Sequence, residues 1–309
     1  MKIRQLLKIA AGSNPITRNA NRWKWVIALD ARVHGADATF TRDSVRIQKG
    51  AQVVAINRRH AIYAGTIAKS FDVFFSAVKP VEENGVSLVD YSTPRVHTLP
   101  DGLQFEFASF PEHPGIIDEY LQWRTPQPGE RVFDLGANWG LSVYRFSKLV
   151  GPGGSVTCFE PDPINLEILK KNIERHDLQN VTVVAAAIGG ADGSAEFSSE
   201  GTIGSQMISL LGRESAGTVV KVPVMSLKTA FEKFGVPDFC KMDIEGAEIE
   251  ALESAIESIS ANKIHFALET RHMVDGEFTD KRVEDIFRRA GYESGTEDKY
   301  DLITYARPA

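Results

Sequence analysis

The sequence predicts an α/β fold built on a parallel sheet that is covered by helices on both faces. From about residue 130 onward, short apolar runs alternate with segments of helical periodicity, and the connections between them are short. Strands that alternate with helices form parallel sheets. A glycine-rich turn joins the first strand to its helix, as in sheets that bind nucleotides. The 309 residues therefore suffice for one large domain and an additional segment.

The strands of this domain can be placed in order from their apolar runs. They are RVFDLG (131–136), SVTCFEP (155–161), VTVVAAAIG (181–189), PDFCKMD (237–243) and KIHFALET (263–270), with YESG (292–295) and YDLITYA (300–306) as a closing hairpin. Helices are expected at 139–150, at 164–176 and after the fourth and fifth strands.

The stretch between the third and fourth strands is less regular, and two extra strands are expected in it. Its Gly/Ser-rich part, 200–218, is predicted to be a substrate lid, with a mobile surface loop as the alternative. Unstructured loops of this length often bind ligands.

Residues 1–110 are predicted to form a basic N-terminal α+β segment, and residues 111–309 the larger domain, with a boundary between 80 and 128. Apolar residues at helical spacing predict a helix at 60–79, and an Asp-Gly turn predicts a hairpin at 93–109. A short helix at 114–124 leads into the first strand.

The charge of the chain is unevenly distributed. The first 70 residues hold thirteen Lys or Arg against three Asp and no Glu, a net charge of +10, so the remainder carries −16 of the overall −6. The basic segment could contact an anionic surface, or it could dock on the acidic body of its own chain or of a second subunit in a homo-oligomer. Because the basic residues are dispersed, no nucleic-acid partner is expected.

No apolar run approaches the length of a membrane span, and the first residues do not resemble a secretory signal. The sequence therefore predicts a cytoplasmic protein. Cys158 and Cys240 lie in apolar runs and are expected to be buried thiols.

The turn DLGANWG is predicted to hold a cofactor through Asp134, Gly136, Ala137, Asn138 and Gly140. Glycines let a ligand approach the backbone, and the start of a helix offers free N–H groups. A carboxylate at Asp134 would repel a pyrophosphate but would suit the cationic S-adenosylmethionine. This charge favours S-adenosylmethionine over NAD.

The second strand ends in Glu160 and Pro161, within FEPDP. A carboxylate at this position can accept hydrogen bonds from both ribose hydroxyls of an adenosine. Glu160 therefore supports an adenosine cofactor without distinguishing NAD from S-adenosylmethionine.

The fourth strand runs into KMDIEGAE, which places Lys241, Asp243, Glu245 and Glu248 at the ligand-binding edge of the sheet. Asp243 is predicted to orient or deprotonate an acceptor hydroxyl, or to hold the amino group of the cofactor. Lys241 is either a base with a depressed pKa or a structural ion-pair partner of Asp243 or Glu245. Acidic residues at the start of a helix are favoured by its dipole, which is the preferred explanation of Glu248.

Glu269 ends the fifth strand and His272 follows it, so either is an alternative catalytic base on the same rim. Together with Asp243 and Glu245 these groups could also ligate a divalent cation. Their spacing is not diagnostic, and no metal is predicted.

DLGANWG, FEPDP and KMDIEGAE, in this order and spacing, resemble the motifs of the FkbM-type family of S-adenosylmethionine-dependent methyltransferases. The resemblance covers roughly residues 130–270. It implies a Rossmann-like, seven-stranded class I methyltransferase sheet in the order 3-2-1-4-5-7-6, with the last strand antiparallel. It also implies methyl transfer to a hydroxyl of a small-molecule or glycan-like acceptor. Where the family commonly has Thr-Leu-Asp before the helix that leads to the fourth strand, this chain has Ser226, Leu227 and Lys228.

Two alternatives to an O-methyltransferase stay open at this point. An NAD-dependent oxidoreductase is disfavoured by Asp134 and by the absence of the second glycine of a GxGxxG pattern. A non-catalytic scaffold that retains the fold would either not bind the cofactor or bind it independently of Asp134.

Overall fold

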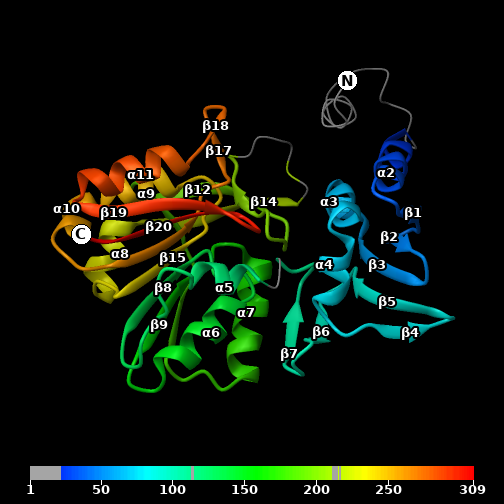
Figure 1. Ribbon diagram of the computed structural model, residues 1–309, viewed down its shortest axis with the longest axis horizontal. Helices are drawn as coiled ribbons and strands as arrows, with labels where there is room; N and C mark the ends of the chain where they lie inside the picture. Colours follow the sequence, from blue (N-terminus) through cyan, green and yellow to red (C-terminus); the bar gives the residue numbers. More distant parts are fainter. Residues whose placement is uncertain (1–21, 113–114, 211–214, 216) are drawn as a thin grey trace. The chain divides into compact units, whose positions relative to one another are not determined.

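The computed structural model describes residues 22–112, 115–210, 215 and 217–309 (Figure 1). The chain divides into two compact units, Met1–Pro114 and Gly115–Ala309. The division falls inside the range that the sequence suggests for a domain boundary. Each unit has its own sheet.

A seven-stranded sheet forms the centre of the second unit, in the order β10-β9-β8-β15-β16-β20-β19. Its strands are β8 (Arg131–Leu135), β9 (Ser155–Phe159), β10 (Val181–Val184), β15 (Phe239–Met242), β16 (His265–Glu269), β19 (Tyr292–Asp298) and β20 (Leu302–Pro308). Counted along the chain, this is 3-2-1-4-5-7-6. The first five strands are parallel, and β20 pairs antiparallel with β16 and with β19. The predicted α/β fold with a seven-stranded sheet is thereby confirmed.

Side chains alternate across the strands and build a core on each face of the sheet. Val132 packs with Phe146 of α6 (Leu141–Val150) and Leu169 of α7 (Pro163–Arg175). Phe133 and Leu135 point the other way, into a core that the remaining large helices complete. These helices are α8 (Leu227–Phe234), α9 (Glu248–Ser254), α10 (Ile256–Ser260) and α11 (Asp280–Arg289). The short α5 (Ile116–Tyr120) adds Tyr120 to the first core.

A second sheet interrupts the regular alternation, in the order β11-β14-β12-β13. It comprises β11 (Ala187–Gly189), β12 (Gly193–Ser199), β13 (Gln206–Met207) and β14 (Thr218–Ser226). The prediction of one strand at 181–189 is wrong, because the run breaks at Ala185 and Ala186 and its halves join different sheets. The interruption holds three strands of the new sheet, where two were expected.

The first unit contains α2 (Arg22–Val33) and a five-stranded sheet in the order β1-β2-β3-β5-β4. Its strands are β1 (Asp37–Phe40), β2 (Ser44–Lys49), β3 (Gln52–Asn57), β4 (Val81–Glu83) and β5 (Val86–Tyr91). The predicted hairpin is present as β6 (Arg95–Thr98) and β7 (Gln104–Phe107). The prediction of a single helix at 60–79 is wrong. A 3-10 turn (Arg58–Tyr63), α3 (Ala64–Lys69) and α4 (Phe71–Ser76) replace it, because Ser70 leaves the helical conformation.

Within the ranges that the structure describes, no helix has both the length and the apolar character needed to cross a membrane. Cys158 and Cys240 are buried free thiols, as expected.

Candidate functional site

The predicted site residues of the second unit gather at the carboxyl ends of β8, β9, β15 and β16. In β15 the side chains alternate, so Phe239 and Lys241 face the α6–α7 core and Cys240 and Met242 face the opposite core. The strand ends at Met242. Asp243 follows directly and lies on the rim, where ligands bind in parallel α/β sheets.

The glycine turn after β8 approaches the end of β15 so closely that there is no space for a side chain at Gly136. Gly136 has φ of 80°, and a Cβ there would lie 1.8 Å from the backbone oxygen of Asp243. Gly140, with φ of 88°, begins α6, and a Cβ at this position would lie 2.4 Å from Leu169. Packing against backbone and a positive φ both require glycine at position 136, whereas at Gly140 the positive φ is the main requirement, because Leu169 is a flexible side chain.

Asp134 and Lys241 form a buried ion pair beneath this turn. Asp134 is fully buried and Lys241 is 2% exposed, and Nζ of Lys241 lies 3.4 Å from Oδ1 of Asp134. Lys241 also donates a hydrogen bond to the carbonyl of Gly136 over 2.7 Å, while Ser142 donates to Oδ2 of Asp134. These contacts assign both residues to holding the turn in shape.

Glu160 is positioned for a ligand with hydroxyl groups. Its carboxylate is 4% exposed and accepts hydrogen bonds from the backbone N–H groups of Asn138 and Asp162, both at 2.8 Å. Each carboxylate oxygen keeps a further lone pair. The side-chain oxygen of Asn138 is buried without a hydrogen-bond partner. These acceptors beside the glycine turn fit the ribose of an adenosine.

The same turn does not fit a pyrophosphate. The N–H groups of Gly136 and Ala137 both donate to the carbonyl of Phe159, so they are not offered to an anion. Lys241 is buried and paired. The residues present therefore fit S-adenosylmethionine better than a dinucleotide.

Asp162 joins the cofactor turn to the segment after β12. Its Oδ1 accepts from the N–H of Ile164 and the hydroxyl of Ser199. Its Oδ2 accepts from the N–H groups of residues 200 and 201 and from the hydroxyl of Ser205. The first part of the predicted lid, 200–205, is thus fixed to the start of α7. Residues 211–214 and 216 of the predicted lid lie outside the described residues.

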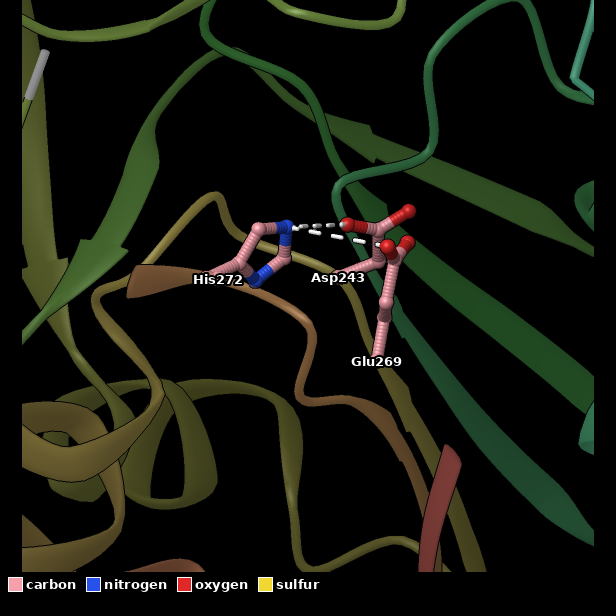
Figure 2. Close-up of side chains that lie close together, drawn as sticks. All are labelled: Asp243, Glu269 and His272. Carbon is pink, nitrogen blue, oxygen red and sulfur yellow. Dashed lines mark ion pairs between the residues drawn. The ribbon is translucent and has the colours of Figure 1, made fainter. Parts of the chain in front are cut away.

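Asp243, Glu269 and His272 point toward one another on the rim (Figure 2). Nε2 of His272 lies 3.6 Å from Oδ1 of Asp243 and 4.0 Å from Oε1 of Glu269. Glu245 reaches the same nitrogen at 3.7 Å, although β15 ends three residues before it. Glu245 has φ of 58°, and the turn that it makes brings its carboxylate back to the rim.

Glu248 holds the imidazole in place from the opposite side. Its Oε1 is 2.9 Å from Nδ1 of His272 and accepts hydrogen bonds from the N–H groups of Ile244 and Gly246. The carboxylate is fully buried. The contact with His272 was not foreseen, because a favourable helix dipole alone explains an acidic residue at this position.

The ionisation of the rim follows from burial and from these neighbours. Burial lowers the pKa of His272, but the Glu248, Glu245 and Glu269 carboxylates outweigh it and raise the pKa well above its usual value. Burial, with a contribution from Asp243, raises the pKa of Glu269 well above its usual range. The rim therefore contains groups that hold protons at neutral pH next to groups that accept them.

The sequence did not indicate a role for two residues near the rim, Tyr120 and Asp162. The hydroxyl of Tyr120 donates to Oδ2 of Asp243 over 3.4 Å, and Nζ of Lys241 lies 5.4 Å from the centre of its ring. Asp162 follows Pro161 in FEPDP, and its link to residues 199–205 has no signal in the local sequence.

Parts of the chain are similar to known proteins. The model of the methyltransferase FkbM domain matches residues 134–294, just over half of the chain. A segment of 50 residues is 44% identical to 31-O-demethyl-FK506 methyltransferase FkbM of Streptomyces tacrolimicus, which is 16% of this chain and 19% of that protein. A segment of 76 residues is 37% identical to a protein-L-isoaspartate O-methyltransferase of Aeropyrum pernix, which is 25% of this chain and 29% of that protein.

Among solved structures, a methyltransferase FkbM from Methylobacillus flagellatus aligns with a TM-score of 0.44 and 23% identity, over 59% of this chain and 44% of that chain. The matched segments span less than a third of these curated relatives. The family model, which begins at Asp134 and extends past His272, contains every residue of the site described above except Tyr120. The chain belongs to the FkbM family of S-adenosylmethionine-dependent methyltransferases.

Proposed function

We propose that the protein transfers a methyl group from S-adenosylmethionine to a hydroxyl of a small-molecule or glycan-like acceptor. One observation carries this proposal: the ends of β15 and β16 bring Asp243, Glu269 and His272 together, directly beside the glycine turn that contacts the backbone of Asp243. Groups that take up a proton thus lie next to the predicted site of the methyl donor.

On the donor side, the bound cofactor supplies an electrophilic methyl carbon on a sulfonium. Gly136 and Gly140 have positive φ and give the turn beside the cofactor its shape. The carboxylate of Glu160 and the free side-chain oxygen of Asn138 would accept hydrogen bonds from its ribose. Lys241 and Asp134 keep the turn in shape from below.

On the acceptor side, the chain must align a hydroxyl and take up its proton. Asp243 is the best-placed base, because its side chain is only 10% exposed and Tyr120 and His272 orient its two oxygens. Glu269 and His272 are alternatives on the same rim. As the new C–O bond forms, the electron pair of the breaking C–S bond stays on sulfur and the hydroxyl proton passes to the rim.

Three expectations stay predictions: the class of the acceptor, the contact of the basic N-terminal segment with an anionic surface, and a homo-oligomeric state. The Gly/Ser-rich segment is the proposed source of acceptor contacts. Leu210 supports this assignment, because its Cδ1 would lie 3.9 Å from a Cβ on Gly246, beside His272.

The proposal is tested by calorimetry with S-adenosylhomocysteine, with NADH as the control ligand. Micromolar binding of S-adenosylhomocysteine without binding of NADH is expected. Asp134→Asn, which keeps the shape of the side chain, should weaken this binding. Binding of NADH alone would indicate an oxidoreductase, and binding of neither ligand would favour a scaffold.

Asp243→Ala then distinguishes the two sides of the site. The variant should lose turnover and keep most of its affinity for S-adenosylhomocysteine. A loss of that affinity would move Asp243 to the donor side.

A further inference from the structure

One ring nitrogen of His272 lies close to three carboxylates, but it is too far from each of them for a hydrogen bond. Nε2 lies 3.6, 3.7 and 4.0 Å from oxygens of Asp243, Glu245 and Glu269. A hydrogen bond from a ring nitrogen to an oxygen is about 2.7–3.2 Å long. The four groups therefore surround a space that none of them closes.

The rest of the structure holds this arrangement in place. Glu248 occupies the other ring nitrogen of His272 at 2.9 Å and is itself fixed by two backbone N–H groups. The side chain of Asp243 is nine-tenths buried, and among the described residues only its Oδ2 has a hydrogen-bond donor, the hydroxyl of Tyr120. Its Oδ1 is directed at Nε2 of His272 (Figure 2).

The nearest ammonium group does not fill the space between these carboxylates. Lys241 is the nearest ammonium group described, but its closest carboxylate is Asp134 at 3.4 Å, and it meets Asp243 at 3.9 Å on the oxygen that faces away from His272. Three carboxylates thus converge on one imidazole nitrogen. Because Nδ1 faces Glu248, Nε2 is the ring nitrogen that faces these three carboxylates.

We propose that Asp243, Glu269 and His272 bind a divalent cation. One oxygen of each carboxylate and one ring nitrogen lie within 4.8 Å of one another, which is compact enough for them to share one ion. Glu248 would act as the carboxylate that orients the metal-binding histidine, and Glu245 as a further oxygen donor. Two carboxylates and one imidazole combine hard oxygen donors with a nitrogen donor, which suits Mn²⁺.

This proposal changes the expectation that no metal takes part. A cation bound here would lower the pKa of an acceptor hydroxyl that coordinates it and would so ease removal of the proton. That role rests on the proposed methyl transfer. Binding of the ion does not, and it can be measured without an acceptor.

The experiment uses the full chain after treatment with EDTA and desalting. Mn²⁺ is titrated into the protein, and free Mn²⁺ is counted by electron paramagnetic resonance. We expect a single site of micromolar affinity in the wild type. His272→Gln and Glu269→Gln should each weaken it by at least about tenfold. The control Asp275→Asn removes a carboxylate from an exposed turn close to the rim, and it should leave the affinity unchanged.

Two results would overturn the proposal: no saturable binding in the wild type, or binding that both rim variants retain. The wild-type titration needs no variant to fold. Binding of S-adenosylhomocysteine, measured in EDTA in parallel, separates the two proposals. S-adenosylhomocysteine binding without Mn²⁺ binding refutes the metal site alone. Mn²⁺ binding without S-adenosylhomocysteine binding refutes the methyl-donor site alone.

Discussion

The hydroxyl of Ser205 donates a hydrogen bond of 2.6 Å to Oδ2 of Asp162. The two residues are 43 positions apart in the chain, and Asp162 also stands next but one to Glu160, the predicted ribose ligand. Since Asp162 accepts further bonds from Ser199 and from the N–H groups of residues 200 and 201, it connects the donor side of the site to the segment proposed to meet the acceptor.

Asp162→Asn should release this segment. The new side-chain amide would point its own N–H groups at the backbone N–H groups that now donate to Oδ2. Buried donors left without an acceptor cost about 1–3 kcal/mol of stability. Urea denaturation should show a loss of that size, and hydrogen exchange should become faster in residues 199–207. KM for the acceptor should rise more than kcat falls.

Asp192→Asn is the matched control for this variant. Asp192 likewise accepts from a backbone N–H and a hydroxyl, those of Ser226 and Thr229, but it lies on the surface at the start of α8. It should leave hydrogen exchange in 199–207 unchanged. Equal exchange in wild type and Asp162→Asn would show that other contacts hold the segment.

Lys241→Met should destabilise the second unit, because it leaves the carboxyl group of Asp134 fully buried and without its cation. Removal of one partner from a buried ion pair costs about 3–5 kcal/mol. We expect a loss of this size in urea denaturation and a partial recovery when Asp134→Asn is added. The control Lys148→Met, on the exposed surface of α6, should change little.

The alternative role of Lys241, as a base, makes the opposite prediction. A lysine that acts only in catalysis could be replaced by methionine with normal stability and a large loss of turnover. That result would contradict the structural role argued here.

The sheet and the donor turn could be predicted from sequence because each follows a local rule. Apolar runs and helical segments place β8, β9, β15 and β16, and the strand-end rule then gathers Asp134, Glu160, Asp243 and Glu269 on one rim. The break at Ala185 and Ala186 could not be predicted in this way, because alanine fits strand and loop alike.

Contacts between segments that are far apart in the chain could not be predicted from the sequence either. The hydrogen bond between His272 and Glu248 joins the loop after β16 to a helix 24 residues away in the chain. Glu248 already had a sufficient local explanation at the start of α9. The same holds for Asp162, whose position before a helix is that of an ordinary cap. Local patterns indicate which elements form, but they do not identify which side chains meet across them.

Affinity for S-adenosylhomocysteine should depend on pH through Glu160. Burial and the nearby carboxylate of Asp162 raise the pKa of Glu160 to about 8, against the opposing effect of its two backbone N–H donors. The ionised carboxylate accepts hydrogen bonds from ribose hydroxyls better than the neutral acid does. Affinity should therefore rise as the pH increases toward and through about 8, and level off above it.

Calorimetry at a series of pH values tests this dependence. Glu160→Gln should bind more weakly at high pH and should lack the rise, and it also corrects for titration of the ligand itself. A pH dependence that is the same in Glu160→Gln and wild type would exclude Glu160 as its source.

The first unit should lose stability in acid through His97. The ring is buried, stacks on Phe107 at 5.6 Å and has an Nε2 atom without a hydrogen-bond partner. Burial, together with the charge of Arg95, lowers its pKa to about 4, although Asp90 opposes the shift. The unfolded chain, with a histidine pKa near 6.5, binds the proton more tightly. The stabilisation is thus complete above about pH 6.5 and is lost as the pH falls toward 4, by about 3 kcal/mol.

Hydrogen exchange of the β5–β7 amides between neutral pH and about pH 4 measures this loss, after correction for the intrinsic effect of pH on exchange. His97→Phe keeps an aromatic ring against Phe107 and removes the titrating group, so its stability should fall less steeply. His34→Gln, in the same unit but at the more exposed end of α2, should behave like the wild type. Because carboxylates elsewhere also titrate in this range, the difference between His97→Phe and wild type is the decisive quantity, and parallel curves would contradict the role of His97.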